Sequence, residues 1–248
     1  MIASNYGSWA EEVQAPWDAL RAAGHDVTLA TYKGMTPLPG RMSMDPEFID
    51  PQQGVPINPQ WVVDRVNEIL DTGEWDNPIK TADANMDDYD ALVLVGGAGS
   101  ALDIAGNMDV HDLVLSAYKS GKTVGALCYT VAALAFTRDP DNGNRSVIYG
   151  KHVTAHPHAW DFRGDHPYVT VRATDVNPGI TLVTNGFAFP LQYMVTDAVG
   201  DASLVSADPT TSRDKPSVVY DAPFVTALSV ESSIAYAQKL VEILGSEA

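Results

Sequence analysis

Two short runs of apolar residues, 91–95 and 123–127, constrain the fold of this chain more than any other feature. Neither run alternates between apolar and polar residues, which is typical of strands that helices cover on both faces of a parallel sheet. Between them, residues 109–120 have the spacing of a helix that ends at Gly121. A strand, a helix and a second strand in this order predict a right-handed crossover and a doubly wound α/β sheet.

The alternation of helices and strands continues on both sides of this unit. Helical spacing recurs in four other stretches, at 9–23, 61–70, 189–199 and 232–244. Further strand-like patterns are found at 25–30, 147–154, 168–173 and 180–184. Residues 217–220 and 224–227 are predicted to form a hairpin around Asp221-Ala222-Pro223. No repeat, low-complexity tract or clear linker interrupts this order, so we expect one domain.

Composition limits the partners and the compartment. The formal net charge is −17, from 15 Lys and Arg against 32 Asp and Glu, whereas nucleic acid and anionic lipid are bound by basic patches. We therefore expect a small-molecule substrate and no nucleic-acid partner. We also expect no membrane partner, since no run of about 18 apolar residues is present. The absence of a visible secretory signal and the presence of a single cysteine favour a reducing cytoplasm.

The single cysteine, Cys128, follows the second apolar run directly and precedes a helix-like segment at 129–136. A nucleophile at a strand-to-helix junction is typical of a nucleophile elbow, in which backbone N–H groups can hold an oxyanion. The positive end of the helix also favours a thiolate. The alternative is a structural thiol, because free cysteine is among the most buried residue types.

Two other features lie where a parallel sheet brings them near Cys128. The Gly96-Gly97-Ala98-Gly99 turn follows the first apolar run and could direct a backbone N–H at the sulfur, although its spacing is not that of a dinucleotide-binding motif. Glu11 and Glu12 occupy the first turn of the first helix. One of these carboxyls could share a proton with the thiol, or both could be surface acids that the helix dipole favours.

Three histidines, His152, His156 and His158, cluster in one segment. Their spacing could suggest a metal, but Pro157 breaks the regularity and no second cluster supplies further ligands. We therefore predict neither a metal nor a cofactor, and a histidine that acts as a base to Cys128 is the simpler interpretation. No serine lies in a G-x-S-x-G elbow, so a serine hydrolase is not expected.

These landmarks together resemble the ThiJ/PfpI superfamily, which has the class I glutamine amidotransferase-like fold. The matching segments extend over most of the chain, at 12–17, 23–30, 88–97, 125–128 and 218–227. The resemblance implies a flavodoxin-like three-layer α/β/α sandwich with a mostly parallel sheet, and a homodimer. Within the superfamily the chain resembles the chaperone and glyoxalase III-type branch. On this basis we expect a single domain over 1–248, with loop or cap insertions near 32–88 and 158–187.

By position, the resemblance implies that Cys128 is the nucleophile and that Glu12 is its partner acid. Gly97 and the N–H of Tyr129 match the oxyanion donors, and Ala98 lies in the same turn. Many relatives have histidine where this chain has Tyr129, and many also have histidine in place of Ala98. The elbow is therefore a non-standard Cys-Tyr type.

A second group of residues is implied by the same resemblance. His156 matches a histidine that lies near the cysteine, Asp161 an acid that orients a histidine, and Trp160 and Phe162 could line a pocket. Near the last strand, Leu228-Ser229-Val230 replaces the usual asparagine-proline.

Three functions remain open from the sequence. The first is a cysteine-dependent enzyme on a small electrophilic substrate, either a glyoxalase III-like hydratase or lyase or a related C–N hydrolase. The second is a redox sensor or holdase chaperone that uses oxidation of Cys128. The third is an isonitrile hydratase or amidase-type activity.

Overall fold

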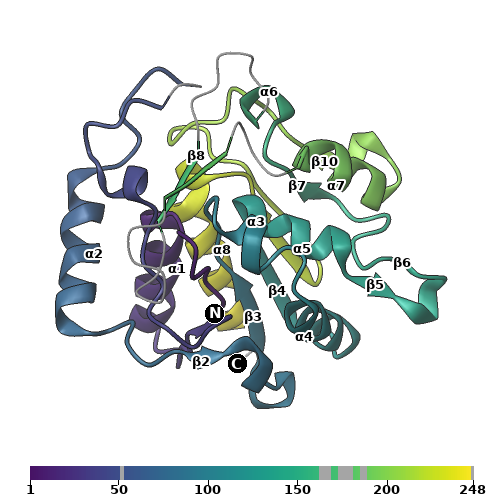
Figure 1. Ribbon diagram of the computed structural model, residues 1–248. Coiled ribbons are helices and arrows are strands. Elements are labelled where there is room, and N and C mark those ends of the chain that lie inside the picture. The colour runs from purple at the N-terminus through teal and green to yellow at the C-terminus, as the bar shows by residue number, and fades with distance from the viewer. Residues whose placement is uncertain (51–52, 162–168, 173–180, 185–188, 247–248) are drawn as a thin grey trace.

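The computed structural model describes residues 1–50, 53–161, 169–172, 181–184 and 189–246 (Figure 1). Its central sheet contains the two apolar runs as adjacent parallel strands, β3 (Ala91–Leu94) and β4 (Thr123–Leu127). Strand β12 (Phe224–Ala227) pairs in parallel with β4, and β11 (Val218–Asp221) pairs antiparallel with β12. The predicted buried strands and the predicted hairpin are therefore both present.

The first residues of the chain extend the sheet beyond β3. Ile2 forms parallel bridges to Leu94 of β3 and to Ala30 of β1 (Ala30–Thr31). Strand β1 then pairs in parallel with β2 (Ile79–Lys80). Only the edge strand β11 runs antiparallel to its neighbour in this sheet, so the described sheet is mostly parallel, as expected.

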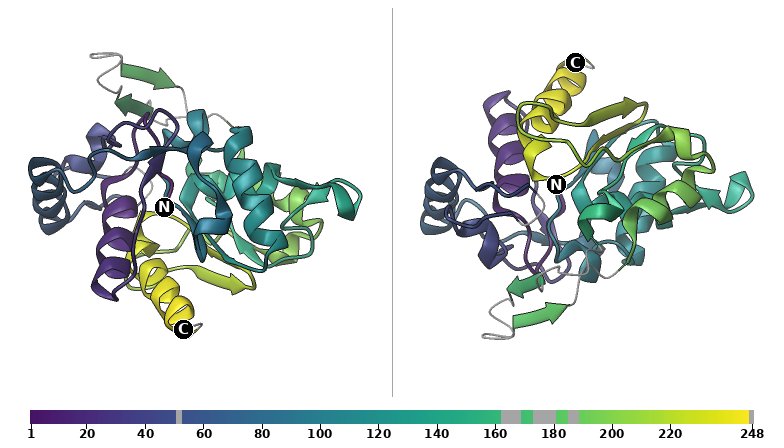
Figure 2. Two further views of the ribbon diagram at one scale, coloured as in Figure 1. Left: turned by 90° about the horizontal axis from the view of Figure 1, so that it is seen from below. Right: turned by 90° about the horizontal axis from the view of Figure 1, so that it is seen from above.

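Helices cover both faces of the sheet (Figure 2). On one face, α1 (Ala10–Ala22) packs along α8 (Ser233–Ser246), which contacts β4 and β12. On the other face lie α4 (Met108–Lys119) and α5 (Val131–Phe136). The resulting three layers confirm the flavodoxin-like α/β/α sandwich.

The remaining helices lie outside these layers. Helix α2 (Gln60–Thr72) packs against α1, and α7 (Leu191–Val199) packs against α5. Two one-turn helices, α3 (Ser100–Asp103) and α6 (His158–Asp161), follow loops at the carboxyl end of the sheet (Figure 1). No helix among the described residues has the length and apolar character needed to cross a membrane.

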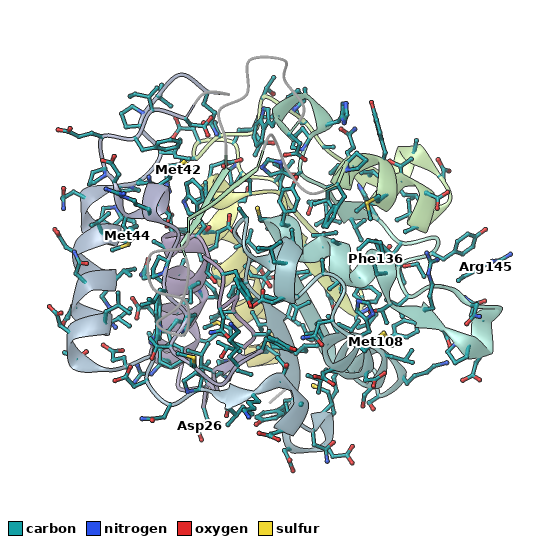
Figure 3. The ribbon with its side chains drawn as sticks, viewed as in Figure 1. Asp26, Met42, Met44, Met108, Phe136 and Arg145 are labelled. Carbon is teal, nitrogen blue, oxygen red and sulfur yellow. The ribbon has the colours of Figure 1, made fainter. Side chains whose placement is uncertain are left out.

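Three small strand pairs complete the fold: β5 (Arg138–Asp139) with β6 (Arg145–Ser146), β7 (Val153–Thr154) with β10 (Val205–Ser206), and β8 (Val169–Arg172) with β9 (Thr181–Thr184). Figure 3 shows Arg145 of β6 at the periphery of the molecule, where its guanidinium lies 4.4 Å from the centre of the Tyr149 ring.

Two predicted strands are shorter than expected. Of the predicted strand 25–30, only the last residue belongs to β1. Strand β1 is short because it pairs only with Ile2, Ile79 and Lys80 among the described residues. Of 147–154, only Val153–Thr154 pairs with another strand, and the backbone at 149–151 turns instead. The expected insertion at 158–187 lies in large part outside the described residues.

The core explains why these strands are apolar throughout. All five residues of β4 are buried, and the last three residues of β3 are buried as well. Burial on both faces stabilises the fold by about 25 cal/mol for each Å² of apolar surface removed from water. Because β3 and β4 end at the same edge, the core places the turns at Gly96 and Cys128 side by side.

Candidate active site

Cys128 lies at a strained junction between β4 and α5. Its φ angle is +60°, in the left-handed region that residues other than glycine seldom adopt. The Thr130 hydroxyl accepts a hydrogen bond from the Leu127 N–H (3.1 Å) and donates to the Leu127 carbonyl (2.8 Å). The same hydroxyl is 3.3 Å from the Leu94 carbonyl at the end of β3. Thr130 therefore holds the elbow against both strands, and the sequence did not single it out.

Backbone N–H groups reach the sulfur from two sides. The N–H groups of Gly97 and Tyr129 both act as hydrogen-bond donors to Cys128. Gly97 has a φ of +111°, and a Cβ at this position would overlap the backbone N of Trp9. The Gly97 carbonyl accepts a 2.6 Å hydrogen bond from the Ser100 hydroxyl, which fixes the turn. The donors thus come from the positions that the sequence indicated.

The Glu12 carboxyl forms a hydrogen bond with the Cys128 side chain, and both residues are buried. Burial raises the pKa of Glu12 well above its ordinary value, and the nearby Glu231 and Glu11 add to this rise. Burial also raises the pKa of the Cys128 thiol, and the charge of Glu12 raises it further, whereas the two N–H donors oppose the rise. Glu12 and Cys128 are therefore a coupled pair, in which the protonation of one group affects the pKa of the other.

A second cluster lies against the aromatic ring of Tyr129. His156 Nδ1 is 2.6 Å from Asp161 Oδ1, and both residues are buried. The His156 ring packs against Tyr129 (5.4 Å between ring centres) and against Trp160 (5.2 Å). Burial lowers the pKa of His156, but the Asp161 carboxylate, together with the charges of Glu231 and Asp50, outweighs burial, so that the net pKa is raised.

Asp161 is shared by two side chains of this cluster. Burial raises the pKa of the Tyr129 hydroxyl well above its ordinary value, and an interaction with the Asp161 carboxylate raises it further. Tyr129 is therefore a hydrogen-bond donor at neutral pH rather than a base. His156 is the histidine of this cluster, and imidazole is the side chain that ordinarily exchanges protons near neutral pH.

The structure does not bring every predicted residue to the sulfur. Ala98 is half-buried, and its carbonyl accepts a hydrogen bond from Ala101 within its own turn. Trp160 contacts His156 rather than Cys128 in the contacts described. Phe162 lies outside the described residues.

The three clustered histidines have separate environments. His152 Nε2 is 3.0 Å from the Ser206 hydroxyl, and the His158 ring stacks on Tyr193 with 4.3 Å between ring centres. His156 alone pairs with Asp161.

Two charged residues near the pair were missed by sequence reasoning. Glu231 lies in the turn Val230–Ser232 before α8, is 5% exposed, and is close enough to raise the pKa of Glu12. Arg213 forms an ion pair with Glu11 (Nη1 to Oε1, 2.7 Å) and donates to the Ile57 carbonyl. Glu231 is distinguished by its burial and Arg213 by its ion pair with the buried Glu11, and the sequence context of the two residues reveals neither feature.

The fold and the elbow together define a class of flavodoxin-like proteins with a cysteine after a central strand. The chain matches the DJ-1/PfpI family over residues 1–243. This chain therefore belongs to the DJ-1/PfpI family.

Several solved structures share this fold. Rapid Encystment Protein 24 KDa from Francisella tularensis superposes with a TM-score of 0.70 at 20% identity, covering 98% of this chain and 96% of that one. Glyoxalase III from Candida albicans has a TM-score of 0.68 at 19% identity, covering 97% and 94%. DJ-1beta from Drosophila melanogaster has a TM-score of 0.54 at 20% identity, covering 98% and 87%. At these identities the likeness shows the fold alone.

One curated relative matches in sequence. The uncharacterized protein MJ0967 from Methanocaldococcus jannaschii is 35% identical over 75 residues. That match spans 30% of this chain and 33% of MJ0967.

Proposed function

We propose that Cys128 is the nucleophile of an enzyme that converts a small 2-oxoaldehyde into a 2-hydroxy acid, as a glyoxalase III does. The observation that carries this proposal is the Cys128 sulfur itself, which accepts hydrogen bonds from the Gly97 and Tyr129 N–H groups and is hydrogen-bonded to the Glu12 carboxyl. A buried carboxyl in contact with a nucleophile can transfer a proton during the reaction, a contribution of about 10²–10⁴-fold in rate.

The reaction needs no outside oxidant or reductant. The sulfur adds to the aldehyde carbon, and the aldehyde oxygen takes a proton to give a hemithioacetal. Glu12 in its carboxylate form removes the hydrogen of that carbon as a proton, the adjacent ketone carbon takes up a proton, and the hydroxyl proton of the hemithioacetal passes to the ketone oxygen, which leaves a thioester of the 2-hydroxy acid. Water cleaves the thioester and restores the thiol. The aldehyde carbon is thus oxidised while its neighbour is reduced, and the net change is the addition of one water.

We assign the last step to His156. Asp161 lies 2.6 Å from Nδ1 and orients the ring, and we assign Nε2 to the proton of the attacking water. Tyr129 fills the position of the histidine that follows the cysteine in many relatives, and it supports the base through the shared Asp161. The rings of Tyr129 and Trp160, which both pack against His156, support this orientation.

The test is turnover of methylglyoxal, a small 2-oxoaldehyde, with detection of the 2-hydroxy acid formed. We expect Cys128→Ser to abolish turnover and Glu12→Gln to lower kcat by about 10²-fold or more. Glu12→Gln is also expected to shift the pH profile of Cys128 alkylation to lower pH, because the charge that raises the thiol pKa is removed. Glu68→Gln, on the surface of α2, is the matched control. Full turnover in Cys128→Ser would exclude the proposal.

A second function rests on the same hydrogen bonds. The Gly97 and Tyr129 N–H groups and the Glu12 carboxyl can also stabilise a sulfinate, formed when two molecules of peroxide each deliver one oxygen to the sulfur. Intact-mass spectrometry after mild peroxide treatment would then show a gain of about 32 Da, confined to Cys128. Such a gain without turnover of any 2-oxoaldehyde favours a redox sensor or holdase over the enzyme.

A homodimer and a cytoplasmic location complete the proposal, and both rest on the family resemblance and on the single cysteine. Mass photometry at nanomolar concentration tests the dimer.

A further inference from the structure

Glu231 presents an unusual buried carboxyl beside the Cys128 pair. Neither of its side-chain oxygens has a hydrogen-bond partner of normal geometry among the described residues, although its own backbone N–H and Ser229 are close enough to lower its pKa against the effect of burial. Its exposed fraction is 5%. Burying a carboxyl without donors costs several kcal/mol in general, and such groups need an explanation when they occur in a folded protein.

The cationic groups near Glu231 are already engaged. Arg213 is held by both oxygens of Glu11, and His156 is held by Asp161. Once these two pairs have formed, the described surroundings of Glu231 retain a surplus of negative charge, to which Glu12 and Asp50 contribute. The turn at the start of α8 offsets part of that surplus through the helix dipole.

The position of Glu231 connects it to the reacting group. It acts electrostatically on Glu12, which bonds to the Cys128 sulfur, and on His156, which packs against Tyr129. One further acceptor, Glu12 Oε2, also has no hydrogen-bond partner among the described residues. Glu12 and the nearby Glu231 thus present three carboxyl oxygens without a hydrogen-bond partner of normal geometry among the described residues, and a primary ammonium group supplies three N–H donors and one positive charge.

We propose that Glu231 recognises a positively charged group on the substrate, so that the Cys128 site prefers electrophiles that carry an ammonium group and disfavours anionic ones. This inference rests on the proposed role of Cys128 as nucleophile and narrows its substrates to amino-substituted carbonyl compounds. An uncharged Glu231 that serves only as a buried polar group is the competing explanation.

The experiment uses three alkylating probes of similar size and different charge. These are 2-bromoethylammonium, iodoacetamide and iodoacetate, and each rate at Cys128 is divided by the rate of the same probe with a small free thiol. In the wild-type protein we expect the cationic probe to be favoured over the anionic one. Glu231→Gln should reduce this preference by about tenfold, the effect expected from removing one nearby charge in a partly buried site. Glu242→Gln, on the exposed part of α8, should leave it unchanged.

Two outcomes distinguish a failure of the inference about Glu231 from a failure of the proposed function. If Cys128 reacts with all three probes and the charge preference is the same in Glu231→Gln and in the wild type, the inference about Glu231 is wrong while the nucleophile remains. If no probe labels Cys128 in the native protein but all label it after unfolding, the proposed function fails, and the substrate preference fails with it.

A further readout needs no variant and covers the case in which Glu231→Gln does not fold. Ethylammonium should protect Cys128 of the wild-type protein from iodoacetamide at constant ionic strength, whereas acetate should not. Equal protection by both ions, or by neither, contradicts the inference.

Discussion

Replacing Gly96 with alanine tests whether the elbow depends on close packing between β3 and β4. A Cβ at Gly96 would overlap Glu12 Oε2 and would lie 2.5 Å from the Leu127 carbonyl oxygen and 2.8 Å from Cys128 Cβ. The φ of Gly96 is outside the left-handed region, so the cost of the methyl group is steric rather than conformational. All three contacts involve atoms of the proposed site or of its supporting strand.

The size of the effect follows from which atoms can move. Overpacking a core by one methyl group costs about 1–3 kcal/mol. The Leu127 carbonyl is part of β4, Cys128 Cβ is fixed to the elbow backbone, and Glu12 is 1% exposed, so none of the three can swing into solvent. We therefore expect the upper end, about 3 kcal/mol, which for a domain of this size lowers Tm by about 6–12 °C.

The assays are thermal unfolding and the pH profile of Cys128 alkylation. Gly96→Ala should lower Tm and also change the alkylation profile, because Glu12 and Cys128 must move apart. Gly106→Ala is the matched control, since no described heavy atom lies within 4 Å of a Cβ at Gly106 and its φ is not left-handed. If Gly96→Ala has the same Tm and the same alkylation profile as Gly106→Ala, the close packing at the elbow is refuted.

Three other substitutions test separate parts of the structure. Burial raises the pKa of Asp103 to about 6, so ionisation of its carboxyl lowers the free energy of unfolding as pH rises from about 4 to about 6. Over that range, denaturant unfolding should show the free energy of unfolding of Asp103→Asn rising relative to that of the wild type by up to about 3 kcal/mol. A difference between the two proteins that does not change with pH would contradict this. A Cβ at Gly125 would overlap the Tyr236 hydroxyl oxygen, so Gly125→Ala should lower the free energy of unfolding by about 1–3 kcal/mol. Adding Tyr236→Phe should restore part of this loss, whereas additive effects of the two substitutions in the double variant would argue against the contact. Asp161→Asn should lower the pKa of His156, since only the charges of Glu231 and Asp50 then oppose burial, and an unchanged NMR titration of the His156 ring would show that Asp161 does not control it.

Much of the fold could be predicted because buried parallel strands are recognisable from their apolar residues alone. The runs at 91–95 and 123–127 gave β3 and β4 almost to the residue. Strand length at 25–30 and 147–154 could not be obtained in this way, because an apolar residue can be buried in a turn as well as in a strand. Val147 illustrates this, since it is buried and bonds to Thr137 outside the named strands.

The site was predictable only where local pattern and sheet topology agree. Cys128 and Gly97 follow adjacent parallel strands, so the edge of the sheet places them together whatever the rest of the chain does. Glu231 and Arg213 depend instead on contacts between distant segments, such as the ion pair that joins Arg213 to Glu11 across 202 residues of sequence. The local sequence around an acidic residue does not predict whether that residue forms an ion pair.

The absence of a side chain at Gly97 determines in which direction each residue of α1 points. Its turn lies against the backbone of Trp9, whose N–H donates to the Gly96 carbonyl at 3.2 Å one residue before α1 begins. Successive helical residues differ by about 100° in direction, so this contact decides which of two adjacent glutamates faces the sulfur. Glu12 faces Cys128 and Glu11 faces Arg213. A one-residue insertion between Trp9 and Ala10 would therefore turn Glu11 toward Cys128, carry Glu12 past it, and leave Ala10 in the position that faces Arg213.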